Sequence, residues 1–450
     1  MKTTLTVILI AVLVTGCTGR KDSKISSESS KAAQTEIAAD TSFNSVVWPQ
    51  KQGRTIIVGG SGAEIKGFSS QAIQTAINAL RAQGNGGTIL LTAGSFDITA
   101  PVKLYSNMSL KGEGAMTILK KCKGYSSPFA IDADYGELQV TVNDASGFAP
   151  GMGVAVYDDE QRSGWALTTA RILAVKGNTI YLDDYLLRDY VKSRNGTVSN
   201  ACSVIEAVEA ENIIISDLTV DGSNETNTMI DGCRAGGIYL HKVHRALVEN
   251  VHVKNFNSDG ISWQITEYVT VRKCEVSGCN NSGLHPGTGS PFTVIEENNS
   301  HNNGGYGLFV CWRVRNGIAR NNDLHDNGIN GISTGHKDTA MVFTDNRIFR
   351  NGEDGITLRG ESENNEPHGT VIRNNIIENN GLKKKSYGIS IYCKARNVLI
   401  EGNTFRNSTG SNQSAALFLS ANSIPAILRN NDTTGMAEGE VVNESGSAVK

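Results

Sequence analysis

The chain repeats the phrase Gly237-Ile238-Tyr239-Leu240 at a nearly constant interval. Its further copies are Gly260-Ile261-Ser262-Trp263, Gly283-Leu284-His285-Pro286, Gly307-Leu308-Phe309-Val310, Gly331-Ile332-Ser333-Thr334, Gly355-Ile356-Thr357-Leu358 and, after a longer gap, Gly388-Ile389-Ser390-Ile391. The first six copies follow one another every 23 or 24 residues. A fixed period of this length indicates stacked supersecondary units, and the copies are too close together for pairs of helices.

Each repeat also carries a second strand-like run before its glycine phrase. Within these runs the apolar residues tend to alternate, which turns one side of each strand inward. Asparagine recurs at equivalent turns, where it tolerates a left-handed backbone and can form a stacked ladder. The asparagines are Asn298, Asn322, Asn346, Asn375, Asn403 and Asn431. Strands, turns and period together predict an all-β parallel β-helix with structural asparagine ladders.

The region upstream of the repeats predicts a cap for the solenoid. Residues 69–81 have apolar residues at helical spacing behind a serine cap, and strand-like runs follow over 86–98 and 102–114. This organisation resembles the pectin-lyase-like superfamily over roughly residues 50–435. The resemblance implies a right-handed parallel β-helix whose open end is plugged by a short helix. It says less about chemistry, because that superfamily includes lyases, hydrolases, epimerases and non-enzymes.

The repeat is interrupted between about residues 130 and 200. The runs 138–142, 154–157 and 178–182 predict strands of a small β insertion, and coils resume at residues 212–222. An insertion on such a scaffold often forms one wall of a groove. We therefore expect a single β-helix domain over residues 48–450 that carries this insertion.

The amino terminus predicts export. Met1-Lys2, an apolar run from Leu5 to Val14 and Thr15-Gly16-Cys17 are typical of a signal peptide over 1–17, too short to span a membrane. Small residues before Cys17 resemble the bacterial lipobox, which implies lipidation of Cys17 and an anchor in the cell envelope, at the outer membrane. Residues 18–47 have the composition of a flexible tether, so the lipid would be the chain's contact with the membrane.

Overall composition adds few constraints on function. The net charge of −3 gives no field that would attract nucleic acid. The chain has 48 glycines and 8 prolines, which favours many tight turns over disorder. Seven cysteines follow Cys17 without a C-x-x-C pair. Cys274 and Cys279 are the closest pair, and we interpret them as small inward-facing side chains.

The repeat also predicts which side chains share a column. One residue after each glycine the aliphatic side chain should face inward, and the residues two and four after it should face solvent. Equivalent residues of adjacent coils lie about 4.8 Å apart. Five and six residues after the glycines, the middle coils align Trp312 with His336 and Arg313 with Lys337 and Glu361.

These columns predict a groove over the coils that begin at Gly283, Gly307, Gly331 and Gly355. Cations, an aromatic ring and backbone bared by glycine suit an anionic sugar chain. A solvated salt-bridge ladder is the alternative interpretation. His301 aligns with core positions of other coils, so we expect it to face the interior.

Polysaccharide lyases of the resembled superfamily cleave uronate polymers by β-elimination. A cation neutralises the carboxylate, a base removes the C5 proton, and the leaving oxygen is stabilised. Members use Lys or Arg as base, a pattern that Lys337 and Arg359 fit, and His336 or His285 is the competing base. The remaining predicted roles are a carboxylate clamp for Arg313, a sugar platform for Trp312, a Tyr/His version of the reaction for Tyr306, and groove lining for Gln264 and Asp259.

Calcium is an open possibility. Some β-helix lyases neutralise the carboxylate with Ca²⁺, for which Glu361, Glu363 and Asp338 are the candidate ligands, and the loop with Asp221, Asn224 and Asn227 is a second oxygen-rich site. None has a diagnostic spacing, and the alternative is a reaction that needs no cofactor.

The leading hypothesis is an exported lyase for a uronate-containing polysaccharide of glycosaminoglycan or alginate type. A glycoside hydrolase, a uronate epimerase and a non-catalytic carbohydrate-binding β-helix are the alternatives.

Overall fold

The computed structural model describes residues 53–360, 362, 364–408 and 410–448. The predicted signal peptide 1–17 with Cys17, the tether 18–47, and Glu361 and Glu363 lie outside these residues. Among the helices of the described part, none is long and apolar enough to cross a membrane.

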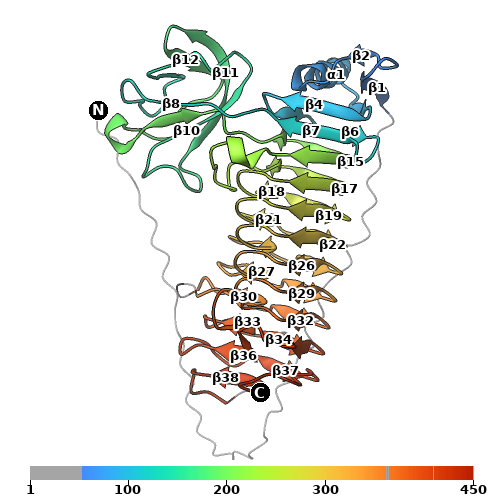
Figure 1. Ribbon diagram of the computed structural model, residues 1–450, viewed down its shortest axis with the longest axis vertical. Helices are drawn as coiled ribbons and strands as arrows, with labels where there is room; N and C mark the ends of the chain where they lie inside the picture. Colours follow the sequence, from blue (N-terminus) through green and yellow to red (C-terminus); the bar gives the residue numbers. More distant parts are fainter. Residues whose placement is uncertain (1–52, 361, 363, 409, 449–450) are drawn as a thin grey trace, which may run out of the picture. The chain divides into compact units, whose positions relative to one another are not determined.

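The glycine phrases form one face of a parallel solenoid (Figure 1). Its 11 strands stack in chain order, and equivalent residues pair across each step, as Ile238 does with Ile261 and Ile261 with Leu284. The strands are β5 (Val102–Leu104), β14 (Ile205–Val208), β16 (Ile238–His241), β18 (Ile261–Gln264), β21 (Leu284–Gly287), β24 (Leu308–Phe309), β27 (Ile332–Thr334), β30 (Ile356–Leu358), β33 (Ser386–Ile391), β36 (Gln413–Leu419) and β38 (Val441–Asn443).

The runs before the phrases form two further parallel columns. In β15 (Glu211–Asp221) and β17 (His244–Lys254) one long strand serves both columns, bent at the left-handed residues Asp217 and Asn250. Later coils divide the run in two. The first column continues as β19 (Glu267–Arg272), β22 (Val294–Glu296), β25 (Ile318–Arg320), β28 (Val342–Thr344), β31 (Val371–Arg373), β34 (Leu399–Glu401) and β37 (Ile427–Arg429). The second continues as β20 (Glu275–Ser277), β23 (Asn299–His301), β26 (Asp323–His325), β29 (Arg347–Phe349), β32 (Ile376–Glu378) and β35 (Thr404–Arg406).

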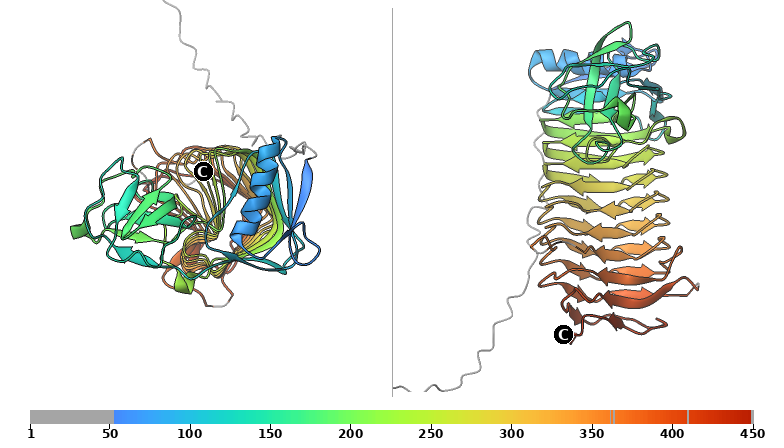
Figure 2. Two further views of the ribbon diagram at one scale, coloured as in Figure 1. Left: turned by 90° about the horizontal axis from the view of Figure 1, so that it is seen from above. Right: turned by 90° about the vertical axis from the view of Figure 1, so that its left-hand side faces the viewer.

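The helix expected upstream is α1 (Ser70–Gln83), which lies across the first coils (Figure 2). The Ser69 side chain accepts a hydrogen bond from the Ala72 N–H, and Gly84 ends the helix in a left-handed conformation. The buried face of α1 covers apolar core that the first coil would otherwise expose. The first coils contain β1 (Arg54–Gly59), β2 (Ile65–Lys66), β3 (Gly87–Leu91), β4 (Gly94–Ile98), β6 (Met108–Gly112) and β7 (Thr117–Lys121).

The interruption of the repeat is a six-stranded antiparallel sheet with an apolar core of its own. It projects from the first coils of the solenoid (Figures 1 and 2). Its strands are β8 (Ser126–Pro128), β9 (Gln139–Thr141), β10 (Gly153–Tyr157), β11 (Thr168–Lys176), β12 (Thr179–Leu182) and β13 (Thr197–Ser199).

Side-chain amides stack along the interior of the solenoid. The predicted ladder is confirmed from Asn298 to Asn431, each amide donating to the oxygen of the next. A second ladder, absent from the predictions, runs through Asn303, Asn327, Asn351, Asn380 and Gln413. Cys274 and Cys279 are buried free thiols, as expected of inward-facing fillers.

Two register predictions need correction. The residue one after each glycine is fully buried as expected, but the residue two after it is not in solvent. Ser262 lies under the carbonyl of Gly232, to which it donates at 2.6 Å, and Ser333 lies under the guanidinium of Arg359. Other parts of the chain therefore cover the outer side of these strands.

The second correction concerns His301. It does not face the core, because Ser300 occupies the inward position of β23 and pairs with Leu324. His301 instead lies on the outer side, where it stacks on His325 with 4.9 Å between ring centroids.

Candidate functional site

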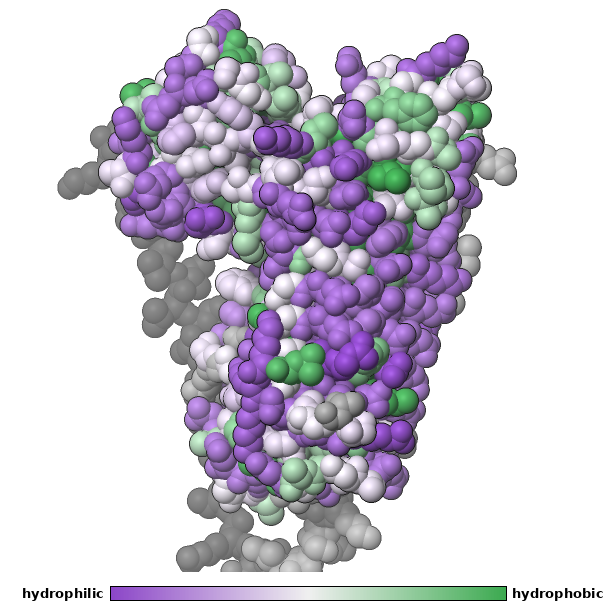
Figure 3. Space-filling view, viewed as in Figure 1, coloured by the Kyte–Doolittle hydropathy of each residue, from purple (hydrophilic) through white to green (hydrophobic). Residues whose placement is uncertain are grey.

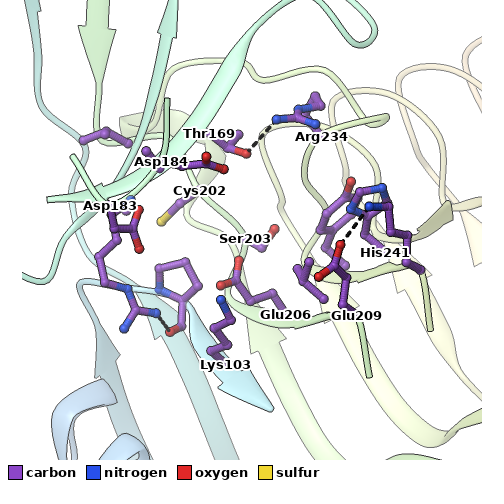
Figure 4. A pocket seen from close by; sticks show the side chains of 18 residues that line it. Lys103, Thr169, Asp183, Asp184, Cys202, Ser203, Glu206, Glu209, Arg234 and His241 are labelled. Atoms are coloured by element: carbon purple, nitrogen blue, oxygen red, sulfur yellow. Dashed lines mark hydrogen bonds and ion pairs between the residues drawn. The ribbon is translucent and has the colours of Figure 1, made fainter. Parts of the chain in front are cut away.

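A pocket of about 370 Å³ lies where the insertion meets the first coils of the solenoid. The insertion does form one wall of it, through β10 and β11, and the opposite wall is the outer side of β5, β14 and β16 (Figure 4). The surface in this region is mostly hydrophilic (Figure 3). Such a concave polar pocket suits a sugar ring with charged substituents.

Three adjacent strands place a cation, an acid and a phenol in one row of the pocket. Glu206 of β14 pairs with Lys103 of β5 on one side and with Tyr239 of β16 on the other. Burial raises the pKa of Glu206, against the opposing charges of Lys103 and Arg171. Burial also raises the pKa of Tyr239, whose hydroxyl donates to the Cys233 carbonyl at 2.8 Å. Both groups therefore keep a proton to higher pH than they would in water.

His241 lies two residues beyond Tyr239 on the same side of β16 and also lines the pocket. Burial, then the charges of Arg234 and Lys242, lower the pKa of His241 to about 4. Its imidazole is therefore neutral at pH 7, and its buried Nε2 has no hydrogen-bond partner among the described residues. The ring lies 5.4 Å from that of Trp165, which comes from the insertion. A neutral imidazole with a vacant nitrogen can accept a proton.

Two arginines bring positive charge to the same space. Arg171 of β11 donates to the Pro101 carbonyl at 3.4 Å. Arg234 donates to Thr169 Oγ1 at 3.4 Å, and its guanidinium lies 5.6 Å from the centre of the Trp165 ring. The buried Nε of Arg234 has no partner within the described chain. A carboxylate in the pocket would balance the charge of the two guanidinium groups.

Three residues that were predicted to line the groove are buried beneath the surface of the solenoid. Asp259 and His285 are buried and pair at 2.6 Å between Oδ2 and Nδ1. Burial would lower the pKa of His285, but Asp259 and Cys311 outweigh it and raise the pKa to about 10. Gln264 is also fully buried, and its amide donates to Ser262 Oγ at 3.1 Å. None of the three lines the pocket.

Two further predicted residues meet on the next coils. Tyr306 stacks on Phe309 with 4.7 Å between ring centroids, and the Arg359 guanidinium lies 4.8 Å from the centre of the Phe309 ring. Arg359 also donates to Ser333 Oγ and to the Val310 carbonyl, both at 3.0 Å. Burial raises the pKa of Tyr306.

The predicted column five residues after the glycines is present as a ring stack. Trp312 and His336 are parallel, with 4.1 Å between centroids and 5° between planes, and Trp312 is 43% exposed. The backbone after each is left-handed, at Arg313 and at Lys337, which is exposed. These residues form an aromatic and cationic ridge at the turns of the solenoid.

The structure offers no ready calcium cage in its described part. No three His, Cys, Asp or Glu residues of that part gather as metal ligands. Asp338 is fully buried, and its two oxygens accept the N–H groups of Val314 and Gly335. Asp221 accepts the Ser223 N–H within its own turn, and the Asn224 side-chain amide donates to the Gly278 carbonyl of another coil.

The glycine phrases do not predict the pocket, because they do not extend upstream to β5 and β14. Lys103 and Glu206 occupy the column two residues after the glycines, but neither of their strands carries a glycine phrase, and the insertion separates them. The run Ile205–Val208 has apolar residues at its first and third positions, as Ile238–His241 does. Aligning the two runs predicts that Glu206 pairs with Tyr239, as the structure shows. Arg171 contributes a cation to the pocket from the sheet of the insertion. Nothing in the glycine repeat predicts the position of that sheet.

The fold has known counterparts. A family model described as a right handed beta helix region matches residues 153–370 and 315–433. The A-module of a mannuronan C-5 epimerase from Azotobacter vinelandii is similar in structure, with a TM-score of 0.53 at 16% identity over 85% of this chain and 95% of that one. An exopolygalacturonase from Thermotoga maritima gives 0.52 at 17% identity, over 89% and 93%. By sequence alone, no curated protein matches. The predicted right-handed parallel β-helix is thus confirmed.

Proposed function

Because this chain belongs to the right-handed β-helix family, we propose that it is a polysaccharide lyase that cleaves a uronate-containing chain by β-elimination. The observation that carries the proposal is the content of one pocket: a neutral histidine, a phenol and a carboxyl with raised pKa, among four cationic side chains. Proton removal beside a carboxylate needs these groups together. The epimerase named above acts, by its name, on a uronate polymer as well.

The residues divide the steps between them. Arg171 and Arg234 bind the uronate carboxylate, which stabilises charge as the C5 proton leaves. His241, whose imidazole lines the pocket, accepts that proton. A bound carboxylate offsets the positive field of Arg234 and Lys242, so it raises the pKa of His241 above its resting value and makes the imidazole a stronger base.

The leaving oxygen requires a proton donor on the same side of the sugar chain. Tyr239 holds its proton at neutral pH, burial raises the pKa of Glu206, and the two residues lie in adjacent strands. We assign the donor role to Tyr239, because it is on the same strand as the base, and we assign Glu206 with Lys103 to sugar hydroxyls. The C5–H and C4–O bonds break, and a C4–C5 double bond forms with a new chain end.

The residues predicted on the middle coils extend this site. Arg313, Lys337 and Trp312 are accessible and remain proposed contacts for the anionic chain beyond the pocket. Lys337 with Arg359, or His336, remains the second proposed base, to be separated from His241 by mutation.

The deciding experiment follows absorbance near the ultraviolet band of a conjugated double bond. The mature protein is incubated with alginate, polygalacturonate, heparan sulfate and hyaluronan in turn. A rise in absorbance that His241→Ala removes and Lys337→Ala preserves supports the lyase with His241 as base. The reverse pattern moves the base to Lys337, and no rise with any uronate polymer contradicts the proposal.

A glycoside hydrolase is the alternative that one observation favours. Glu206 shares the pocket with Asp183, whose charge also raises the Glu206 pKa, and hydrolases use a protonated acid beside a second carboxylate. New reducing ends without absorbance would support it. An epimerase would give neither, but would exchange the C5 proton with solvent.

We propose that cationic side chains neutralise the carboxylate without Ca²⁺, so activity should survive a chelator. Loss of activity on chelation and its return with Ca²⁺ would contradict this. We also propose lipid anchoring through Cys17, which the mass of the mature amino-terminal peptide tests directly.

A further inference from the structure

A short turn, Asp231–Arg234, delivers one of the pocket's cations. Its backbone closes on Asp231, whose carbonyl accepts the Arg234 N–H at 3.0 Å and whose side chain accepts the Cys233 N–H at 2.9 Å. From this turn Arg234 reaches Thr169 on the opposite wall of the pocket (Figure 4), and its guanidinium also lies over the ring of Trp165 in the insertion. The direction of Arg234 is therefore set by where the turn sits.

The turn sits directly on a buried ion pair. A Cβ atom added to Gly232 would lie 1.5 Å from Asp259 Oδ2 and 3.1 Å from His285 Nδ1, so the glycine is needed for this close approach. Two hydrogen bonds hold the turn down on either side. Ser262 Oγ donates to the Gly232 carbonyl at 2.6 Å, and the Tyr239 hydroxyl donates to the Cys233 carbonyl at 2.8 Å.

The ion pair is itself fixed to the solenoid. Asp259 Oδ1 accepts the Ser282 N–H at 2.7 Å, and Oδ2 lies 2.6 Å from His285 Nδ1. Both side chains are buried, although burying a charge pair is costly and apolar residues would pack as well. Neither residue lines the pocket. The pair thus has a defined position and a single turn resting on it.

We propose that Asp259 and His285 are positioning residues, which seat the turn Asp231–Arg234 and thereby aim Arg234 at the substrate carboxylate. The inference rests on the proposed function, because that carboxylate is the group Arg234 would bind. Asp259 and His285 then influence binding without touching the sugar.

The first test is kinetic, on whichever uronate polymer is cleaved. Gly232→Ala and His285→Gln should each raise KM by about tenfold, as loss of one charge-assisted contact would, and lower kcat no further than Arg234→Ala does. Arg234→Ala should raise KM at least as much and also lower kcat, because Arg234 stabilises charge as the C5 proton leaves. Adding Gly232→Ala or His285→Gln to Arg234→Ala should change neither constant further. His325→Gln is the matched control, since His325 pairs with Asp326 at 2.5 Å on the outer side of another column.

The second test needs no substrate. Hydrogen exchange of the peptide covering residues 231–236 should be faster in His285→Gln and in Asp259→Asn than in the wild type, and unchanged in His325→Gln. Faster exchange without turnover of any polymer would refute the proposed function and keep the positioning role. Unchanged exchange, or additive KM effects in the double variants, would overturn the positioning role while leaving the lyase intact.

Discussion

The imidazole of His241 lies beside two cations, Arg234 and Lys242, in a half-buried place that further disfavours its charged form. We expect His241→Gln to lower kcat by about 10²-fold or more, as loss of a general base does. In the wild type, kcat/KM should fall on the acid side with a pKa of about 4, which belongs to the free protein. The acid limb of kcat should lie at higher pH, because the bound carboxylate raises the His241 pKa.

A pH–rate profile on the cleaved polymer measures both limbs. His252→Gln is a suitable control, because burial also lowers the pKa of His252, which lies on β17 outside the pocket. Identical acid limbs in the wild type and in His241→Gln would rule out His241 as the titrating base.

His285 carries the opposite shift, with consequences for stability. Its pKa in the folded protein is raised above the unfolded value, so the folded state binds its proton more tightly. This stabilisation is fully present below about pH 6.5, the unfolded value, and is lost as the pH rises toward about 10. His285→Gln should therefore cost about 3 kcal/mol at pH 6 and progressively less toward pH 10. Urea unfolding of both proteins at three pH values checks this, and a constant difference would contradict it.

Single residues also show where sequence reasoning stops. The inward position after each glycine was predictable, because an apolar residue recurs there with the period of the coil. His301 was misplaced by one residue, since its neighbour Ser300 fills the core position with a polar side chain that donates to the Gly307 carbonyl. Apolar residues indicate which positions of a coil face the core. This indication fails where a polar side chain forms hydrogen bonds inside the core.

Among the elements, the stacked amides connect one coil with the next. Asn346 donates to the Ala319 carbonyl and to Asn375 Oδ1, and its own oxygen accepts the backbone N–H and the side-chain amide of Asn322, all near 2.9–3.0 Å. Asn346→Ala would leave several buried partners without a bond, which costs about 1–3 kcal/mol each.

We expect Asn346→Ala to lower the free energy of unfolding by about 3 kcal/mol, within that range for a few partners left unpaired. Asn397→Ala, at an exposed left-handed position, should cost about 1 kcal/mol, the steric cost of that backbone alone. Denaturant unfolding of both variants gives the comparison. Equal losses would mean that the ladder contributes no more to stability than an exposed turn residue does.

The elements explain why the fold was easier to predict than the pocket. Each coil needs an inward-facing apolar residue after a tight turn, so the same signal for a solenoid recurs in seven glycine phrases. The pocket is built where the repeat ends. β5 and β14 lack the glycine, and β11 belongs to a sheet whose position relative to the coils no local pattern encodes. The insertion does form one wall of the pocket, as expected. The depth of the pocket and the cations that line it could be seen only in the structure.

At the scale of the whole molecule, the proposed substrate path follows the solenoid axis. The pocket ends at β16, and the exposed ring of Trp312 follows β24, which lies three strands further along the same face. Three steps of about 4.8 Å place the ring about 14 Å beyond the pocket. A sugar chain held in the pocket would therefore reach Trp312 only if it extended several residues in that one direction.

Trp312→Ala should accordingly act on substrate length and not on chemistry. We expect KM to rise about tenfold for long uronate oligomers, in line with about 1.4 kcal/mol for loss of one aromatic platform, and kcat to stay unchanged. For a trimer, which does not span the distance, both constants should match the wild type. Tyr392→Ala is the control, because Tyr392 is exposed after β33, three strands beyond β24 on the same face. If Trp312→Ala weakened trimers and long oligomers equally, the chain would run across the solenoid and not along it.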